Sequence, residues 1–170
     1  NFCVKYSPKT KEFPCFGSRK CIVEEGDEMF GGAIDYFKSN NFAQILRNIV
    51  DQNRGKKGVF NGVDEITFFF EWYGPKSFAG FHSLGDTLRL AIIDVFLKKK
   101  GYLEPGVYWK LFKDSGIEVP DLIYRGKLTR DFVKEIQEND WTREDSKYPN
   151  VKEGVVVKRS TLSKGQRLLK

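Results

Sequence analysis

Four stretches of the chain have hydrophobic and polar patterns typical of β-strands. Residues 1–6 alternate up to Ser7-Pro8, and residues 13–23 predict a strand pair around the turn residues 17–20. Residues 65–73 are dense in aromatic side chains, which predicts a central strand that ends at Gly74-Pro75. Residues 88–96 are apolar enough to predict a strand that is interior on both faces.

Residues 151–159 read Val-Lys-Glu-Gly-Val-Val-Val-Lys-Arg, and we expect the rest of the chain to be organised around them. Valine is stiff at χ1 and packs well on a pleated surface, so the valine run predicts a buried strand. Strand alternation places Glu153 and Val157 on one face and Val156 and Lys158 on the other. The alternative is an ordinary core strand whose charged ends are solvated.

Helical periodicity appears in three other segments. Residues 42–50 place five apolar side chains on one face, and the polar, glycine-bearing loop 53–58 follows. Residues 105–115 predict a short helix that ends near Gly116, and Thr129 is the predicted N-cap of another helix. Strand pairs with intervening helices predict an α+β fold, and residues 1–170 show no internal domain boundary.

Composition adds a modest positive charge and three cysteines to this picture. The 170 residues carry 29 Lys and Arg against 23 Asp and Glu, a net charge of +6 that favours polyanionic partners. Cys3, Cys15 and Cys21 lack metal-ligand spacing with His82, so we expect free thiols in a reducing, cytoplasmic compartment and no zinc site. We find no signal peptide and no bilayer-length apolar run, and expect a monomer with no membrane partner.

Two carboxylates stand in segments that otherwise favour burial. Glu71 lies among aromatic residues, where ligand hydroxyls would supply the donors that a buried carboxylate needs. The alternative is that Glu71 faces water. Asp94 follows two isoleucines, and a structural hydrogen bond to a turn or a cation explains it as well as a functional role does.

Six basic residues, five of them near the C-terminal end, have the chemistry to contact one polyphosphate. Lysine acts as a point donor and arginine as a forked donor to phosphate oxygens. The alternative is that these cations are solvated strand ends. The set comprises Arg19, Lys158, Arg159, Lys164, Arg167 and Lys170.

The order of these short motifs resembles that of the covalent nucleotidyltransferases, the superfamily of polynucleotide ligases and mRNA capping enzymes. Asn1-Phe2 is similar to the end of motif I, Lys-x-x-Gly-x-Asn-Phe in RNA-repair ligases, and Ser18-Arg19 is similar to motif Ia. Residues 70–80 are most similar to phage and viral ATP-dependent RNA ligases. The resemblance covers nearly the whole chain. The other matches, to motifs III, IIIa, IV and V, are Glu71-Trp72-Tyr73-Gly74, Ile93-Asp94-Val95, Glu153-Gly154-Val155-Val156-Val157-Lys158 and Lys170.

The resemblance implies a nucleotidyltransferase (ATP-grasp-like) fold of antiparallel sheets flanked by helices. It also implies ATP and Mg²⁺ as cofactors and RNA ends or nicks as partners. In this family a lysine attacks the α-phosphate of ATP to form lysyl-AMP. AMP then passes to a 5′-phosphate end, and a 3′-hydroxyl displaces it to seal the strand.

The same resemblance implies roles for four nucleotide-binding residues. Glu71 would hold ribose hydroxyls, and Arg19 would contact the ribose or the polynucleotide end. Val156 and Ile93 would pack on opposite faces of adenine. Ile93 departs from many relatives, which carry an aromatic residue there, so aromatic stacking is lost on that side.

The catalytic residues implied by the resemblance are Glu153, Lys158 and Lys170. Glu153 would position the metal or the attacking lysine, and it is the implied metal ligand. Lys158 and Lys170 would contact phosphate, and both would bind the nucleotide as well. Lys170 would be the first lysine of motif V.

An element that could serve as motif I, Lys-x-Asp-Gly or Lys-x-x-Gly in the right order, is missing from the sequence. We expect a domain truncated at both ends, with the nucleophile just upstream of Asn1. The 170-residue chain is therefore predicted not to form lysyl-AMP, whereas the longer protein does. Other interpretations are a DNA ligase, a GTP-dependent capping guanylyltransferase, or a non-catalytic nucleic-acid-binding relative.

Overall fold

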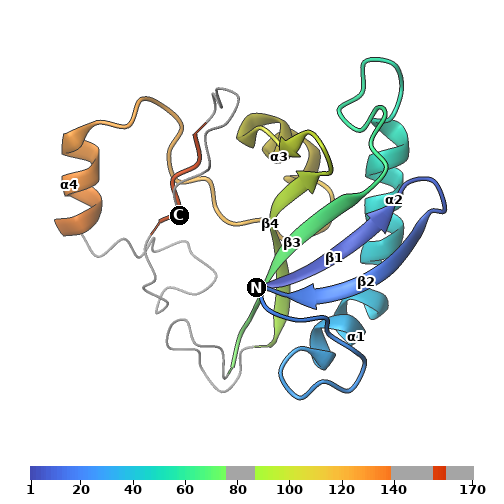
Figure 1. Cartoon of the computed structure of the whole chain (residues 1–170). Helices are drawn as coiled ribbons and strands as arrows, with labels where there is room; N and C mark the ends of the chain where they lie inside the picture. Colours follow the sequence, from blue (N-terminus) through green and yellow to red (C-terminus); the bar gives the residue numbers. More distant parts are fainter. Residues whose placement is uncertain (76–86, 139–154, 160–170) are drawn as a thin grey trace.

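One antiparallel sheet, with strand order β2-β1-β3-β4-β5, forms the centre of the protein (Figure 1). The computed structural model describes residues 1–75, 87–138 and 155–159. The α+β class predicted from the sequence is confirmed, because this sheet is combined with helices. The strands are β1 (Phe2–Ser7), β2 (Glu12–Ser18), β3 (Ile66–Tyr73), β4 (Arg89–Leu97) and β5 (Gly101–Tyr102).

Three of the predicted strands are found within one residue of their expected bounds, namely β1, β3 and β4. Gly74 ends β3 with φ +134°, and a Cβ atom there would lie 2.9 Å from Leu88 Cα. Only glycine avoids both the strain and the clash. The strand pair predicted over residues 13–23 is wrong. β2 ends at Ser18, and Ile22 forms only an isolated bridge with Gly17, because the turn residues leave too few positions for a second strand.

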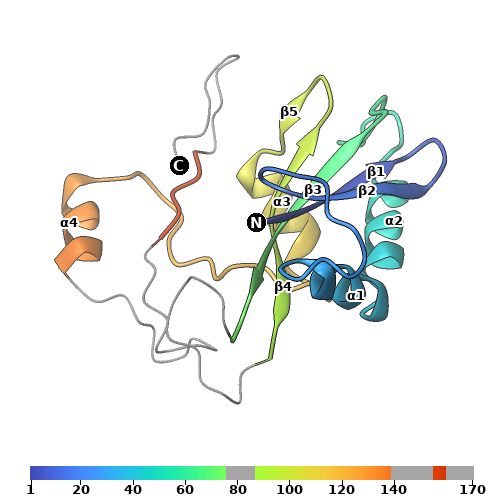
Figure 2. The same ribbon diagram turned by 60° about the horizontal axis from the view of Figure 1, so that its bottom comes forward.

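Helices α1 to α3 cover one face of the sheet, which we call the core face (Figures 1 and 2). The buried aromatic rings show this packing. Phe70 lies 6.1 Å from both Phe37 and Phe42, and Phe68 lies 6.5 Å from Phe112, measured between ring centroids. The helices are α1 (Gly31–Ser39), α2 (Phe42–Gln52), α3 (Pro105–Phe112) and α4 (Arg130–Glu138).

Alternation along the strands separates two chemically different sets of side chains. On the core face, Phe2, Val4 and Tyr6 of β1 are fully buried, as are Ile66, Phe68 and Phe70 of β3. Their neighbours point to the opposite face, which we call the open face. The open face carries Cys3, Lys5, Thr67, Phe69, Glu71, Asp94 and Phe96, and each of them is partly or largely exposed.

A β-bulge in β4 changes which residues reach the open face. Phe69 pairs with Asp94, whereas Phe70 pairs with Ile92, so Ile93 is an extra residue on β4. Ile92 and Val95 are buried in the core, while Ile93 and Asp94 between them are only partly buried. The bulge therefore places two consecutive side chains on the open face. The prediction that this strand is interior on both faces is wrong for this reason.

The C-terminal part of the described chain lies to one side of the sheet (Figures 1 and 2). The predicted N-cap of α4 is confirmed, because Thr129 Oγ1 accepts a hydrogen bond from the Phe132 amide at 3.2 Å. No residue of α4 is buried. Among the described residues, no helix combines the length and the apolar character needed to cross a membrane.

Residues 155–159 form no strand, so the buried strand predicted there is wrong over these positions. Val156 is 80% exposed and Val157 is 50% exposed. Valine favours a strand only when a neighbouring strand edge is free to pair. The adjacent edge of β4 is already occupied by a backbone bridge to Glu118 and by β5. Residues 151–154 of the predicted strand lie outside the described residues.

Candidate nucleotide-binding face

Arg19 and Glu71 lie at the same end of the sheet. Ser18 pairs with Phe2, and Phe2 pairs with Phe70. Arg19 follows Ser18 in the bend after β2, and Glu71 follows Phe70 in β3. Arg19 is exposed, and the Glu71 side chain is 44% exposed with Oε1 3.8 Å from the backbone nitrogen of Asn1. Glu71 therefore faces the solvent side, beside an arginine at the same end of the sheet.

Lys158 reaches the sheet at the β4 bulge. Its Nζ atom donates a hydrogen bond to the Ile93 carbonyl and lies 3.3 Å from Asp94 Oδ2. It also lies 4.7 Å from the centroid of the Tyr108 ring, within the range of a cation–π contact. The side chains of Lys158 and Asp94 are 25% and 17% exposed. This ammonium group is thus held half-buried by two strand positions and one ring.

The edge of β4 is hydrogen-bonded largely by groups outside regular strands. The Ile92 amide donates to the Glu118 carbonyl at 2.8 Å, and the Tyr108 hydroxyl donates to the Ile92 carbonyl. Burial raises the pKa of the Tyr108 hydroxyl above its ordinary value, and the Asp94 charge raises it further. The bulge therefore lies in a partly desolvated setting, where the Lys158 charge interacts more strongly than it would in water.

The predicted nucleotide-binding residues fall into two neighbouring groups. The Ile93 carbonyl contacts Lys158, whereas Glu71 lies nearer the end of the sheet where the exposed Arg19 follows β2. Glu71 pairs with Ala91, two positions before Ile93, so about 7 Å of strand separates the two groups. Val156 is exposed, two residues before Lys158. Glu153 and Lys170 lie outside the described residues.

The contribution of Tyr108 was not predicted from the sequence. Residues 105–115 were predicted as a short helix, and Tyr108 was one apolar position of it. A buried tyrosine hydroxyl usually finds a hydrogen-bond partner, and this tendency was the only signal in the sequence. The observed partner, the Ile92 carbonyl, follows from packing α3 against β4.

The described residues alone do not supply a magnesium site. Carboxylate oxygens are the ligands that Mg²⁺ prefers, and Asp94 and Glu71 offer them on the open face. Asp94, however, already pairs with Lys158 and accepts a hydrogen bond from the Val95 amide at 3.1 Å. Within residues 1–75, 87–138 and 155–159, no three His, Cys, Asp or Glu side chains form a group that could hold a metal ion.

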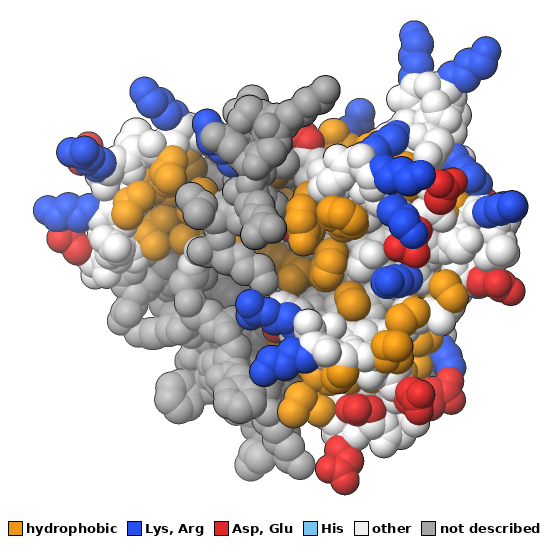
Figure 3. Space-filling view, in the orientation of Figure 1, with side chains coloured by type: hydrophobic (Ala, Val, Ile, Leu, Met, Phe, Trp, Pro, Cys, Tyr) orange, Lys and Arg blue, Asp and Glu red, His pale blue; other side chains and the backbone are white. Residues whose placement is uncertain are grey.

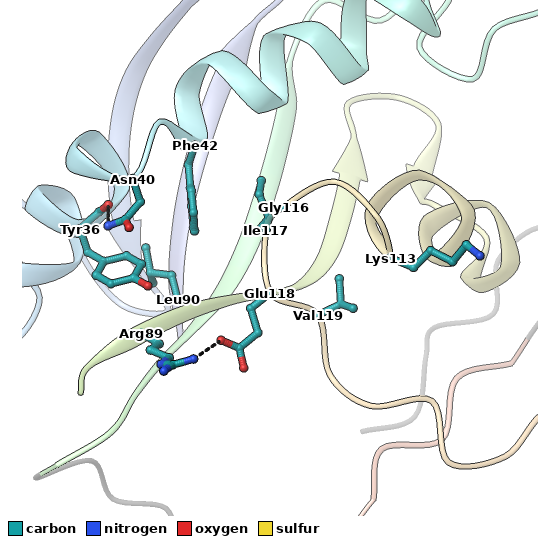
Figure 4. Close-up of a pocket in the computed structure, with 10 residues that line it drawn as sticks. All are labelled: Tyr36, Asn40, Phe42, Arg89, Leu90, Lys113, Gly116, Ile117, Glu118 and Val119. Carbon is teal, nitrogen blue, oxygen red and sulfur yellow. Dashed lines mark hydrogen bonds and ion pairs between the residues drawn. The ribbon is translucent and has the colours of Figure 1, made fainter. Parts of the chain in front are cut away.

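A pocket of about 460 Å³ lies on the helix-covered side of the sheet (Figure 4). Two of its charged groups, Arg89 and Glu118, are engaged with each other. Arg89 Nη1 lies 3.7 Å from Glu118 Oε2, and Tyr73 donates a hydrogen bond to the other Glu118 oxygen. Tyr36, Asn40, Phe42 and Lys113 also line the pocket, and none of the predicted site residues does. The open face, which carries predicted site residues, is therefore a stronger candidate for the nucleotide-binding site than this pocket.

Comparisons with known proteins add no family assignment. No protein-family model matches the chain, and the search of curated proteins found no similar sequence.

Proposed function

We propose that this chain is the adenylyltransferase part of an ATP-dependent RNA ligase. One observation carries the proposal. Three residues that the motif resemblance assigns to a single nucleotide, Glu71, Ile93 and Lys158, lie within about two residues of one another along the sheet, and Arg19 lies at the same end of the sheet as Glu71. The four come from segments up to 139 positions apart (19 to 158), so their arrangement is a property of the fold and not of sequence proximity.

The chemistry of these side chains suits a mononucleotide. The Glu71 carboxylate accepts hydrogen bonds, and ribose hydroxyls are donors of the right kind. Ile93 presents an aliphatic surface against which a base packs. Lys158 is the phosphate-binding cation, and its half-buried position strengthens its attraction for an anion.

Asp94 has a positioning role in this proposal. It lies 3.3 Å from Lys158 and holds the ammonium at the bulge when no nucleotide is bound. Phosphate oxygens then compete with Asp94 for the lysine's three donors. An amine elsewhere in the intact protein attacks the α-phosphorus, a P–N bond forms and pyrophosphate leaves. Lys158 stabilises the charge that develops on the phosphate oxygens.

The test is covalent labelling of the intact protein with α-³²P-ATP. We expect an acid-labile, alkali-stable phosphoramidate, and we expect loss of that label in Glu71→Ala because the ribose contact is removed. Glu138→Ala on α4 is the matched control, since it removes an exposed carboxylate away from the open face. Absence of label on the wild-type protein would refute the proposal.

The choice of nucleotide and polynucleotide separates this function from its relatives. We expect ATP and not GTP to label the protein, which distinguishes a ligase from a capping guanylyltransferase. We also expect sealing of nicked RNA in preference to nicked DNA. Preferential sealing of DNA would reassign the chain to the DNA ligases, and salt-sensitive RNA binding without any label would make it a non-catalytic relative.

A further inference from the structure

A cluster of three aromatic side chains lies on the open face, beside the residues of the proposed nucleotide site. Phe69, Phe96 and Tyr102 come from three neighbouring strands, and we call them the aromatic platform. The Tyr102 ring lies 5.2 Å from Phe96 and 6.0 Å from Phe69, measured between centroids. Tyr102 is 43% exposed, so the platform presents ring surface to solvent.

Four exposed lysines border this platform. Lys5 is aligned with Phe96 and Tyr102, because Lys5 pairs with Thr67, Thr67 with Phe96, and Phe96 with Tyr102. The other three, Lys98, Lys99 and Lys100, form the turn that joins β4 to β5. We call these four residues the lysine rim. Figure 3 shows hydrophobic side chains bordered by Lys and Arg side chains over the strands of the sheet.

The charge of the lysine rim is only partly balanced by nearby carboxylates. Lys98 Nζ lies 3.5 Å from Glu65 Oε2, whereas Lys100 Nζ donates to the Asn61 backbone carbonyl at 2.6 Å, a neutral partner. Asp94, the carboxylate nearest the platform, pairs with Lys158. Stacking surface surrounded by excess cations is complementary to a polyanion that also carries planar bases.

We propose that the aromatic platform and the lysine rim bind a single-stranded polynucleotide. Its bases stack on Tyr102 and its neighbours, and its phosphates lie along the lysines. A duplex fits less well, since its base faces are already stacked on one another. A lipid surface would not require an ordered set of rings beside the cations.

The location of this surface links it to the proposed ligase activity. Phe69 pairs with Asp94, so the platform begins beside the Asp94–Lys158 pair. Asp94 and Phe96 are about 7 Å apart along β4. The surface would thus position the polynucleotide whose end is joined, and this part of the inference rests on the proposed function. Binding of the polynucleotide to the surface does not depend on the proposed function.

The experiment measures binding of a fluorescein-labelled oligouridine of about 12 nucleotides to the intact protein by anisotropy, across a salt series. We expect Tyr102→Leu to weaken binding about tenfold through loss of stacking. Tyr102→Phe keeps the ring and should remain within about twofold of wild type. A thermal melt of each variant checks that the protein is folded, and the Tyr102→Phe result keeps the test decisive if Tyr102→Leu melts early.

The lysine rim is tested through the salt dependence of the same binding. The double variant Lys5→Gln/Lys99→Gln should make the plot of log affinity against log salt shallower by about 1.4, or about 0.7 for each cation removed. The matched control is Lys127→Gln/Lys134→Gln, which removes two exposed lysines near α4 and should leave the slope unchanged. Equal slopes for both pairs would overturn the proposal, as would Tyr102→Leu binding like wild type.

Two further measurements, vesicle binding and ATP labelling, are informative. Binding to phosphatidylserine vesicles but not to oligouridine would overturn the proposal in favour of a membrane surface. Labelling with ATP separates this inference from the proposed function. Tyr102-dependent RNA binding without any ATP label would leave the inference standing and refute the ligase. Normal label with Tyr102-independent binding would refute the inference alone.

Discussion

The two faces of the sheet differ sharply although the same strands build both. On the core face, the side chains of β1 and β3 are fully buried and apolar or aromatic, namely Phe2, Val4, Tyr6, Ile66, Phe68 and Phe70. On the open face, aromatic residues alternate with Lys5, Glu71 and Asp94. Within the described chain no charged side chain is fully buried. The helix-covered face supplies the buried packing, and in the proposed function the open face binds the nucleotide.

This contrast predicts that substitutions will have different consequences on the two faces. Loss of a ring from the core face removes packing on several sides. Loss of a group from the open face should change ligand binding with less effect on folding.

The largest effect on stability is expected for Phe70→Ala. Phe70 is fully buried and packs against Phe2, Phe37 and Phe42. Its truncation should lower the free energy of unfolding by about 3–5 kcal/mol, because a cavity remains. Phe69→Ala, one residue away on the open face, should cost less than half as much. Urea unfolding of both variants measures this, and equal losses would mean that the two faces are not distinct.

Lys158→Ala should slow covalent labelling by ATP about 100-fold, as expected for loss of one charged transition-state donor. Single-turnover labelling of the intact protein gives the rate. Lys134→Ala, which removes an exposed lysine from α4, should label at the wild-type rate. An unchanged rate in Lys158→Ala would show that Lys158, at the β4 bulge, does not take part in the labelling reaction.

Tyr108→Phe should lower the free energy of unfolding by about 1–2 kcal/mol, because the Ile92 carbonyl loses its buried donor. The effect depends on pH. The pKa of Tyr108 is raised in the folded state, so the unfolded chain ionises first, at about pH 10. Above that pH the wild type should lose up to about 1.4 kcal/mol per pH unit through this group. Urea titrations from pH 8 to pH 11 should show a shallower decline in Tyr108→Phe, and parallel curves would contradict this.

The smallest effect is expected for Tyr6→Phe. Tyr6 is fully buried, and its hydroxyl is the one buried side-chain oxygen or nitrogen without a hydrogen-bond partner in the described part of the chain. Removing that hydroxyl should change stability by less than about 0.5 kcal/mol, or increase it, since an unsatisfied polar group is lost. A loss comparable to that of Tyr108→Phe would reveal a partner for Tyr6.

Local sequence patterning predicted most of the strands and three of the helices, α2, α3 and α4. It succeeded for β1, β3 and β4 because each has one buried face. It missed α1, whose short buried set (Ala33, Ile34 and Phe37) follows two glycines. It also failed for residues 155–157, where strand formation depends on a free partner edge and not on valine propensity.

The candidate site could be predicted less completely than the fold. Motif resemblance named Glu71, Ile93 and Lys158, but the contact between the last two requires the bulge at Ile93. A bulge depends on the register between β3 and β4, and no local residue pattern specifies it here. Tyr108 and Tyr102 were missed because their contacts depend on how α3 packs against β4 and how β5 pairs with it.

The central claim is that the nucleotide binds on the open face. Photolabelling of the intact protein with 8-azido-ATP, followed by peptide mapping, tests it most directly. We predict adducts within residues 66–73 and 91–97, suppressed by excess ATP. Adducts confined to residues 36–42 and 113–117, which line the pocket on the opposite side of the sheet, would contradict the claim.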